Sequence, residues 1–178
     1  ANGRKVHNVE DRVGFLDRKL RVVSKYCDDK ASWLFWTKEA FKASYGYEWQ
    51  GDNLLIAREN LLYTFIDYWN AKFPTDKINL DRKVSDEKLT ILKEIATIIS
   101  WNIFQMDGLK YIIPMSGTGK KEKTEEVPPM FAFFGGEYKK TVKKKEEKAG
   151  KPVYIMDWEK GKPIKFESLL RVSGENKN

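Results

Sequence analysis

Apolar residues recur at helical spacing along four stretches of the chain, and polar or helix-breaking residues bound each stretch. This spacing predicts helices over residues 13–27, 30–43 and 52–73, and a fourth helix that begins at Ser85. In the third stretch Asp52 is a suitable N-cap, and Pro74 ends the helix because proline has no backbone N–H to continue it. The apolar stripe of this helix is wide, which is typical of a helix that packs against a sheet.

Two short apolar stretches predict strands, Tyr45–Trp49 before the third helix and Ile103–Met106 after the fourth. An acidic residue lies at the end of each, Glu48 in the first and Asp107 after the second. The order strand–helix–helix–strand favours an α/β fold with a mostly parallel sheet covered by helices. Ligands of such sheets bind outside the carboxyl ends of the strands. Glu48 and Asp107 are therefore candidate ligand contacts; the alternative is a surface glutamate and an ordinary Asp-Gly turn.

The remaining chain divides into a charged stretch and a C-terminal pair of strands. Residues 152–166 surround a Glu-Lys-Gly-Lys turn and predict a β-hairpin, with a short helix after it. Because a two-stranded hairpin is unstable alone, we expect it to pack on the core, where Trp158 and nearby lysines could contact DNA. The predicted organisation is a core over residues 1–115, a flexible basic linker over 116–151, and the hairpin and tail over 152–178.

The charge of the chain favours an anionic partner. Its 178 residues carry a formal net charge of +7, and the sequence pI is about 9.3. Five lysines of the linker form a cluster that could neutralise DNA phosphates without reading sequence: Lys139, Lys140, Lys143, Lys144 and Lys145. The alternative is a solvated tether whose charge is diluted by Glu137, Glu146 and Glu147.

Composition excludes several kinds of chemistry. With one cysteine, Cys27, and one histidine, His7, the sequence offers no disulfide framework, no cysteine-rich zinc site and no Ser-His-Asp triad. We therefore expect no metal. No apolar run reaches the length of about eighteen residues that a membrane-spanning helix needs. These observations predict a soluble, cytoplasmic protein without a membrane partner.

Three short motifs carry a resemblance to a known family. Glu48 is followed by a helix with the run Ala57-Arg58-Glu59-Asn60-Leu61, Asp107 is followed by Gly108-Leu109, and Gly14-Phe15-Leu16 opens a helix. Over residues 14–115 the chain resembles S-adenosylmethionine-dependent DNA methyltransferases that modify adenine N6, of the restriction–modification or phage-associated type. The resemblance implies a Rossmann-like sheet, S-adenosylmethionine as the cofactor and DNA as the substrate.

The resemblance also implies roles for single residues. Glu48 would accept hydrogen bonds from the ribose hydroxyls of S-adenosylmethionine, and Asp107 would accept from its adenine amino group. Apolar residues beside these carboxylates would flank the adenine ring, and Gly14 with Phe15 would lie near the methionine moiety. The implied cofactor-binding residues are Gly14, Phe15, Glu48, Trp49, Asp107, Gly108 and Leu109.

The motifs of this family are incomplete in the chain. The first glycines of the turn before Gly14 are absent. The one Pro-Pro, in Val127-Pro128-Pro129-Met130, lacks the polar and aromatic residues of the family's catalytic loop, and we interpret it as linker. No catalytic residue is assigned. The predicted function is methyl transfer from S-adenosylmethionine to adenine N6 in DNA, in an incomplete or partner-dependent form that an additional protein subunit could complete. The alternatives are a non-catalytic DNA-binding or regulatory subunit with the methyltransferase scaffold, and a protein-interaction module.

Overall fold

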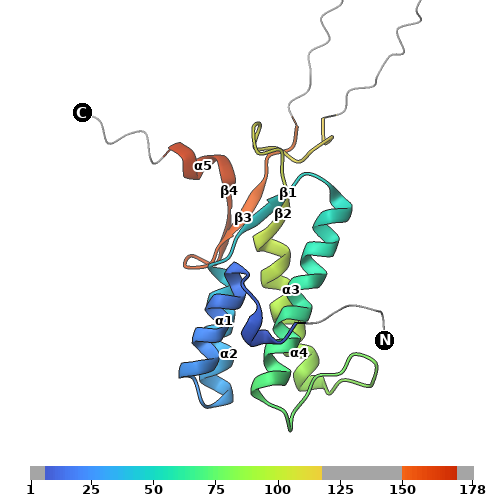
Figure 1. The fold of residues 1–178 in the computed structure, drawn as a ribbon. Helices are drawn as coiled ribbons and strands as arrows, with labels where there is room; N and C mark the ends of the chain where they lie inside the picture. Colours follow the sequence, from blue (N-terminus) through green and yellow to red (C-terminus); the bar gives the residue numbers. More distant parts are fainter. Residues whose placement is uncertain (1–6, 118–149, 172–178) are drawn as a thin grey trace, which may run out of the picture.

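Helices dominate the described part of the chain, and its strands are short. The computed structural model describes residues 7–117 and 150–171 (Figure 1). The elements, in chain order, are η1 (Val9–Asp11), α1 (Phe15–Tyr26), α2 (Lys30–Lys42), β1 (Gly46–Glu48), α3 (Gly51–Lys72), α4 (Asp86–Asn102), β2 (Ile103–Gln105), β3 (Tyr154–Asp157), β4 (Lys162–Lys165) and α5 (Phe166–Arg171). The predicted mixed α/β class is confirmed.

The start of α3 differs slightly from the prediction. Gln50 is the N-cap, because its carbonyl already accepts from the Leu54 N–H at 3.0 Å, and Asp52 lies in the first turn. Asp52 is therefore not the N-cap. Ser85 does precede α4 as predicted, although its side chain makes no capping hydrogen bond.

Strands β1 and β2 pair in parallel, as the strand–helix–helix–strand order predicts. Their register places Gly46 opposite Ile103 and Glu48 opposite Gln105. Within residues 7–117 and 150–171, the parallel sheet has only these two strands. The larger parallel sheet expected from the sequence is not seen there.

The main hydrophobic core lies among α1–α4, which run beside one another below the strands in Figure 1. Aromatic side chains fill its centre: Trp33 and Trp69 are fully buried, with ring centroids 5.8 Å apart and ring planes at 78°. Phe65 packs on both rings at 6.0 Å. Such tilted and edge contacts stabilise an aromatic cluster beyond the burial of its area.

The predicted C-terminal hairpin is confirmed as β3 and β4, which pair antiparallel. Gly161 forms its turn with a φ of 61°, a conformation that glycine adopts without strain. Val153 and Ile155 from the hairpin segment pack on Phe104 and Met106 in a second, smaller core. The hairpin therefore lies on the β1–β2 pair, as expected from the instability of an isolated hairpin.

Asn102, at the end of α4, connects the helical core to the hairpin. Its side-chain Nδ2 donates to the carbonyls of Phe41 at 2.9 Å and Lys42 at 2.7 Å, while its Oδ1 accepts from Trp158 Nε1 at 2.8 Å. Trp158 is thus tied to the core and packs against it. The Trp158 side chain remains half-buried, and contact of the hairpin with DNA stays a prediction.

Candidate functional site

The carboxyl ends of β1 and β2 lie side by side, and they carry the two predicted carboxylates. The Met106 N–H donates to the Glu48 carbonyl at 3.1 Å, so the ladder continues to the last residue of β1. Asp107 follows Met106 directly. The structure therefore brings Glu48 and Asp107 to one edge of the sheet, although they are 59 positions apart in the sequence.

The carboxylate of Glu48 is held by the turn that follows it. Its Oε1 accepts from the N–H groups of Trp49 at 2.9 Å and Gln50 at 3.1 Å. Gln105 fixes the same turn from β2, because its Nε2 donates to the Trp49 carbonyl at 2.9 Å. Oε2 has no hydrogen-bond partner among the described residues. One oxygen thus orients the carboxylate, and the other is available to a donor from a ligand.

Asp107 is held in a similar way, and it is largely buried. Its Oδ1 accepts from the N–H groups of Leu109 at 2.9 Å and Lys110 at 3.2 Å, and 7% of the residue is exposed. Its Oδ2 has no hydrogen-bond partner in the described ranges. An Asp side chain that bonds the backbone two residues ahead stabilises a turn. The arrangement thus serves the turn and also leaves one acceptor for a ligand.

Gly108 lies against the side chain of Tyr47. A Cβ at this position would lie 3.0 Å from Cε2 and Oη of Tyr47, which is closer than an ordinary contact. The Tyr47 ring also stacks on Phe104 at a centroid distance of 6.4 Å. Gly108 therefore allows Tyr47 to approach the turn, and the space next to this glycine is occupied by protein.

Two apolar side chains at the strand ends are open to solvent. Trp49 is 49% exposed and Leu109 is 91% exposed. They lie in the turns that follow two paired strands, Trp49 directly after Glu48 and Leu109 two residues after Asp107, so the edge presents an aromatic and an aliphatic surface beside two carboxylates.

Gly14 and Phe15 lie elsewhere in the fold. Gly14 precedes the first turn of α1, and the hydroxyl of Tyr68 donates to the carbonyl of Asp17 in that turn at 3.1 Å. Tyr68 belongs to the last third of α3, about 25 Å along the helix from its first residue. The structure therefore does not bring Gly14 and Phe15 together with Glu48 and Asp107.

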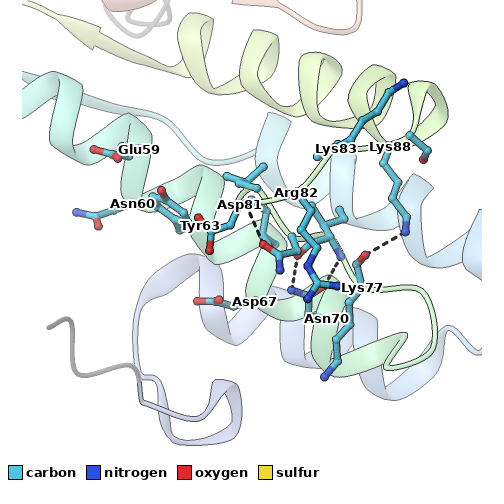
Figure 2. A pocket seen from close by; sticks show the side chains of 16 residues that line it. Glu59, Asn60, Tyr63, Asp67, Asn70, Lys77, Asp81, Arg82, Lys83 and Lys88 are labelled. Carbon is cyan, nitrogen blue, oxygen red and sulfur yellow. Dashed lines mark hydrogen bonds between the residues drawn. The ribbon is translucent and has the colours of Figure 1, made fainter. Parts of the chain in front are cut away.

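A broad groove runs between α3 and the loop that joins it to α4 (Figure 2). Its volume is about 1180 Å³, and sequence reasoning did not find it. The loop is held in place by Asn70, whose side chain bonds both the N–H and the carbonyl of Ile78, at 2.7 and 3.0 Å. The feature of the sequence that could have indicated this groove is the density of Asn, Asp and Lys between Pro74 and Ser85.

Charges of both signs line this groove. Figure 2 shows Glu59, Asn60, Tyr63 and Asp67 along α3, with Lys77, Asp81, Arg82 and Lys83 on the loop. Asp67 is neutralised by Arg12 at 2.6 Å, and Lys88 by Asp76 at 2.5 Å. The mixture that remains favours no single class of ligand.

A second cavity, of about 550 Å³, lies between the end of α2 and the hairpin. It is mainly apolar, with Tyr45, Trp158, Phe166 and Leu169 among its lining residues. Neither cavity includes Glu48 or Asp107.

The five lysines predicted to bind DNA, residues 139–145, and the Pro-Pro at residues 128–129 lie outside the described residues. Among the described residues no group of three or more His, Cys, Asp or Glu is arranged to hold a metal ion. In the same ranges no helix combines the length and apolar character needed to cross a membrane. No protein-family model, curated protein or solved structure matches this chain.

Proposed function

We propose that the edge formed by the ends of β1 and β2 binds the nucleoside part of S-adenosylmethionine, and that the chain is a DNA adenine-N6 methyltransferase or a part of one, with a Rossmann-like sheet. The observation that carries this proposal is the position of Glu48 and Asp107 at adjacent ends of parallel strands. Ligands of open α/β sheets bind at this edge. Each carboxylate also keeps one oxygen without a partner among the described residues.

The chemistry of the edge suits an adenosine group. The Glu48 carboxylate can accept from two vicinal ribose hydroxyls, which are both donors, and the Asp107 carboxylate can accept from the adenine amino group. Trp49 and Leu109 supply apolar surface for the purine ring, and both are exposed. Gly14 and Phe15 lie away from this edge, so the proposal assigns them no contact with the cofactor.

In the proposed reaction the amino nitrogen of adenine attacks the methyl carbon of S-adenosylmethionine in line with the sulfur. The new N–C bond forms as the C–S bond breaks, S-adenosylhomocysteine leaves with the electron pair, and the nitrogen loses a proton. Holding the two reactants in this geometry supplies much of the acceleration. A catalytic loop from a partner or from residues outside the described ranges would complete the site.

Calorimetric titration with S-adenosylmethionine tests the proposal. The double variant Glu48→Gln, Asp107→Asn keeps an acceptor oxygen for each turn and removes both charges. We expect micromolar binding by the wild type and at least a tenfold loss in the variant, because each hydrogen bond to a charged group contributes about 1.5–3 kcal/mol.

The matched control is Glu59→Gln, Asp81→Asn, which makes the same change of charge in the groove beside α3. Its affinity for S-adenosylmethionine should equal that of the wild type. Equal binding by all three proteins would place the cofactor elsewhere, and no binding by the wild type would refute the proposal. The alternative function, a DNA-binding subunit without catalysis, predicts DNA binding that both double variants retain.

A further inference from the structure

The strand-end site, which is the edge formed by the ends of β1 and β2, lies at the N-terminus of the longest described helix. Helix α3 has 22 residues and begins at Gly51, three positions after Glu48. The N-terminus of a helix carries a partial positive charge, and its first N–H groups have no partner within the helix. Such helix ends commonly bind phosphate. A nucleotide at this edge would therefore bring its phosphates to a feature that usually attracts them.

Hydrogen-bond donors for a phosphate are present in the first turn of α3. The backbone N–H groups of Gly51, Asp52 and Asn53 have no partner among the described residues. The first bond of the helix runs from the Leu54 N–H to the Gln50 carbonyl at 3.0 Å. Lack of donors therefore does not exclude a phosphate here, and the charge of the neighbouring side chains decides.

Two carboxylates outweigh the positive end of α3. Glu48 Oε1 accepts from the N–H groups of Trp49 and Gln50, which fixes its negative charge directly before the helix. Asp52 lies in the first turn, where it is exposed and its side chain has no partner among the described residues. The helix end is equivalent to about +0.5 elementary charge, so with two carboxylates the sum is about −1.5. A sum of this sign repels a phosphate.

Few cations oppose these carboxylates. In the stretches 48–54 and 107–111 the only cation is Lys110, against the carboxylates of Glu48, Asp52 and Asp107. Lys110 belongs to the Asp107 turn, on the side proposed for the adenine. Arg58 lies further along α3, and its guanidinium donates to the carbonyl of Ile103 at the opposite end of β2. The side proposed for the ribose therefore keeps its negative charge.

We propose that the strand-end site selects adenosine compounds that carry no phosphate, and that Asp52 is a specificity-determining residue of this site. The inference rests on the proposed function, because that function places the ribose at Glu48. A phosphate on any ribose oxygen would be attached to the sugar that Glu48 holds, next to Asp52. S-adenosylmethionine carries a sulfonium and no phosphate, so it meets this requirement. Adenosine phosphates and dinucleotides do not.

Two ligands with the same nucleoside test the selectivity. 5′-Deoxy-5′-methylthioadenosine is uncharged, whereas adenosine 5′-monophosphate carries a phosphate on the same carbon. Each is titrated into the full chain by calorimetry, alone and in competition with S-adenosylmethionine. We expect the monophosphate to bind at least about tenfold more weakly at low salt, because its phosphate meets a net negative charge. The difference should narrow as salt is added, since salt screens the repulsion between exposed charges.

Asp52→Asn removes one negative charge and nearly preserves the size of the side chain. We expect the affinity for the monophosphate, relative to methylthioadenosine, to rise about two- to fivefold, the usual effect of one charge at a helix end. The matched control is Glu59→Gln, which makes the same change of charge on an exposed residue of α3, about 10 Å further along the helix. Its ratio of affinities should equal that of the wild type. Circular dichroism confirms that both variants fold.

The outcomes separate this inference from the proposed function. Equal affinity for the two nucleosides, with S-adenosylmethionine still bound, would overturn the selectivity alone. Tight binding of the monophosphate that is lost in Lys110→Met would instead make Lys110 a phosphate contact. An effect of Asp52→Asn no larger than that of Glu59→Gln would refute the role of Asp52.

Failure of S-adenosylmethionine to bind has two readings, which direct titration of the nucleosides distinguishes. A retained preference for methylthioadenosine over the monophosphate would refute the proposed function and support the selectivity. Binding of none of the three compounds would overturn both.

Discussion

Asn102 connects parts of the fold that are distant in the sequence. Its amide nitrogen caps the end of α2 through Phe41 and Lys42, and its oxygen receives the indole N–H of Trp158. The residue is 1% exposed. A buried side chain that both donates and accepts in this way cannot be replaced by any residue that does only one of the two.

We expect Asn102→Ala to lower the free energy of unfolding by about 1–3 kcal/mol, because buried carbonyls and an indole N–H lose their partner. Asn102→Asp should cost more, at least about 3 kcal/mol near neutral pH, because a buried carboxylate would face carbonyl oxygens. Urea unfolding of both variants measures the difference.

The same geometry raises the pKa of the introduced carboxyl. As the pH falls through that raised pKa the carboxyl protonates, and the free energy of unfolding of Asn102→Asp should approach that of Asn102→Ala. If the Asp variant were as stable as the Ala variant at neutral pH, the hydrogen-bond pattern of Asn102 would be wrong.

Tyr68 gives a prediction for alkaline pH. Burial, together with the nearby negative charge of Asp17, raises the pKa of its hydroxyl from 10.0 to about 12. Between these values the unfolded chain has lost the phenolic proton and the folded chain has kept it. The stabilisation by Tyr68 is therefore complete below about pH 10 and declines as pH rises towards about 12.

We expect Tyr68→Phe to be less stable than the wild type by about 0.5–1.5 kcal/mol near pH 8, since one hydrogen bond to the carbonyls of Val9 and Asp17 is removed. This difference should diminish near pH 11, and urea midpoints at both pH values measure it. A stability difference between wild type and Tyr68→Phe that grew with pH would contradict the raised pKa of Tyr68.

At the residue scale the sequence located the strand-end carboxylates and missed Asn102. Glu48 and Asp107 stand out because each ends a local apolar run, so a short window contains the signal. Asn102 has no such signal, since its partners Phe41 and Trp158 lie about sixty and fifty-six positions away. The hydrogen bond of Trp158 has no local signal for the same reason, because its partner Asn102 lies outside the hairpin segment.

At the scale of elements, periodicity located the four long helices because a helix buries a stripe that recurs within a few turns. It misplaced the N-cap of α3. The N–H groups before this helix are taken by Glu48, whose Oε1 accepts from Trp49 and Gln50. With these donors already satisfied, the helix begins at Gly51, and Asp52 interacts favourably with the positive end of the helix dipole.

Arg58 links two elements and gives a prediction at this scale. From α3 its guanidinium donates to the carbonyls of Ser100 at 3.0 Å and Ile103 at 2.8 Å, where α4 ends and β2 begins. We expect Arg58→Met to lower the free energy of unfolding by about 1.5–3 kcal/mol, because the hydrogen bonds from a charged group are removed.

Arg82→Met is the matched control for Arg58, since Arg82 is exposed on the groove loop. It should unfold like the wild type. Native-state hydrogen exchange should also show faster exchange at the β1–β2 pair in Arg58→Met alone. Equal stability of the two variants would show that Arg58 does not hold α3 to the junction of α4 and β2.

At the scale of the whole molecule, the sequence predicted the hairpin but not how the chain reaches it. The described residues on either side of positions 118–149 lie close together: the Ile113 N–H donates to the Lys151 carbonyl at 2.9 Å, and the Lys151 N–H donates to Ser116 Oγ at 2.7 Å. Such long-range pairing depends on tertiary packing, which local patterns do not encode.

These hydrogen bonds predict that residues 118–149 can be replaced by a Gly/Ser linker of about eight residues without loss of the fold. Because each halving of a loop lowers its closure cost by about 0.6 kcal/mol, urea unfolding should show equal or slightly greater stability. A large loss of stability would mean that the removed residues pack on the described part.

The same replacement tests the predicted lysine cluster, because it removes Lys139 to Lys145 together. If that cluster binds DNA, duplex affinity should fall, and the slope of log K against log salt should become shallower by about 0.9 for each phosphate that is no longer neutralised. A duplex slope equal to that of the wild type would assign the cluster to a solvated tether.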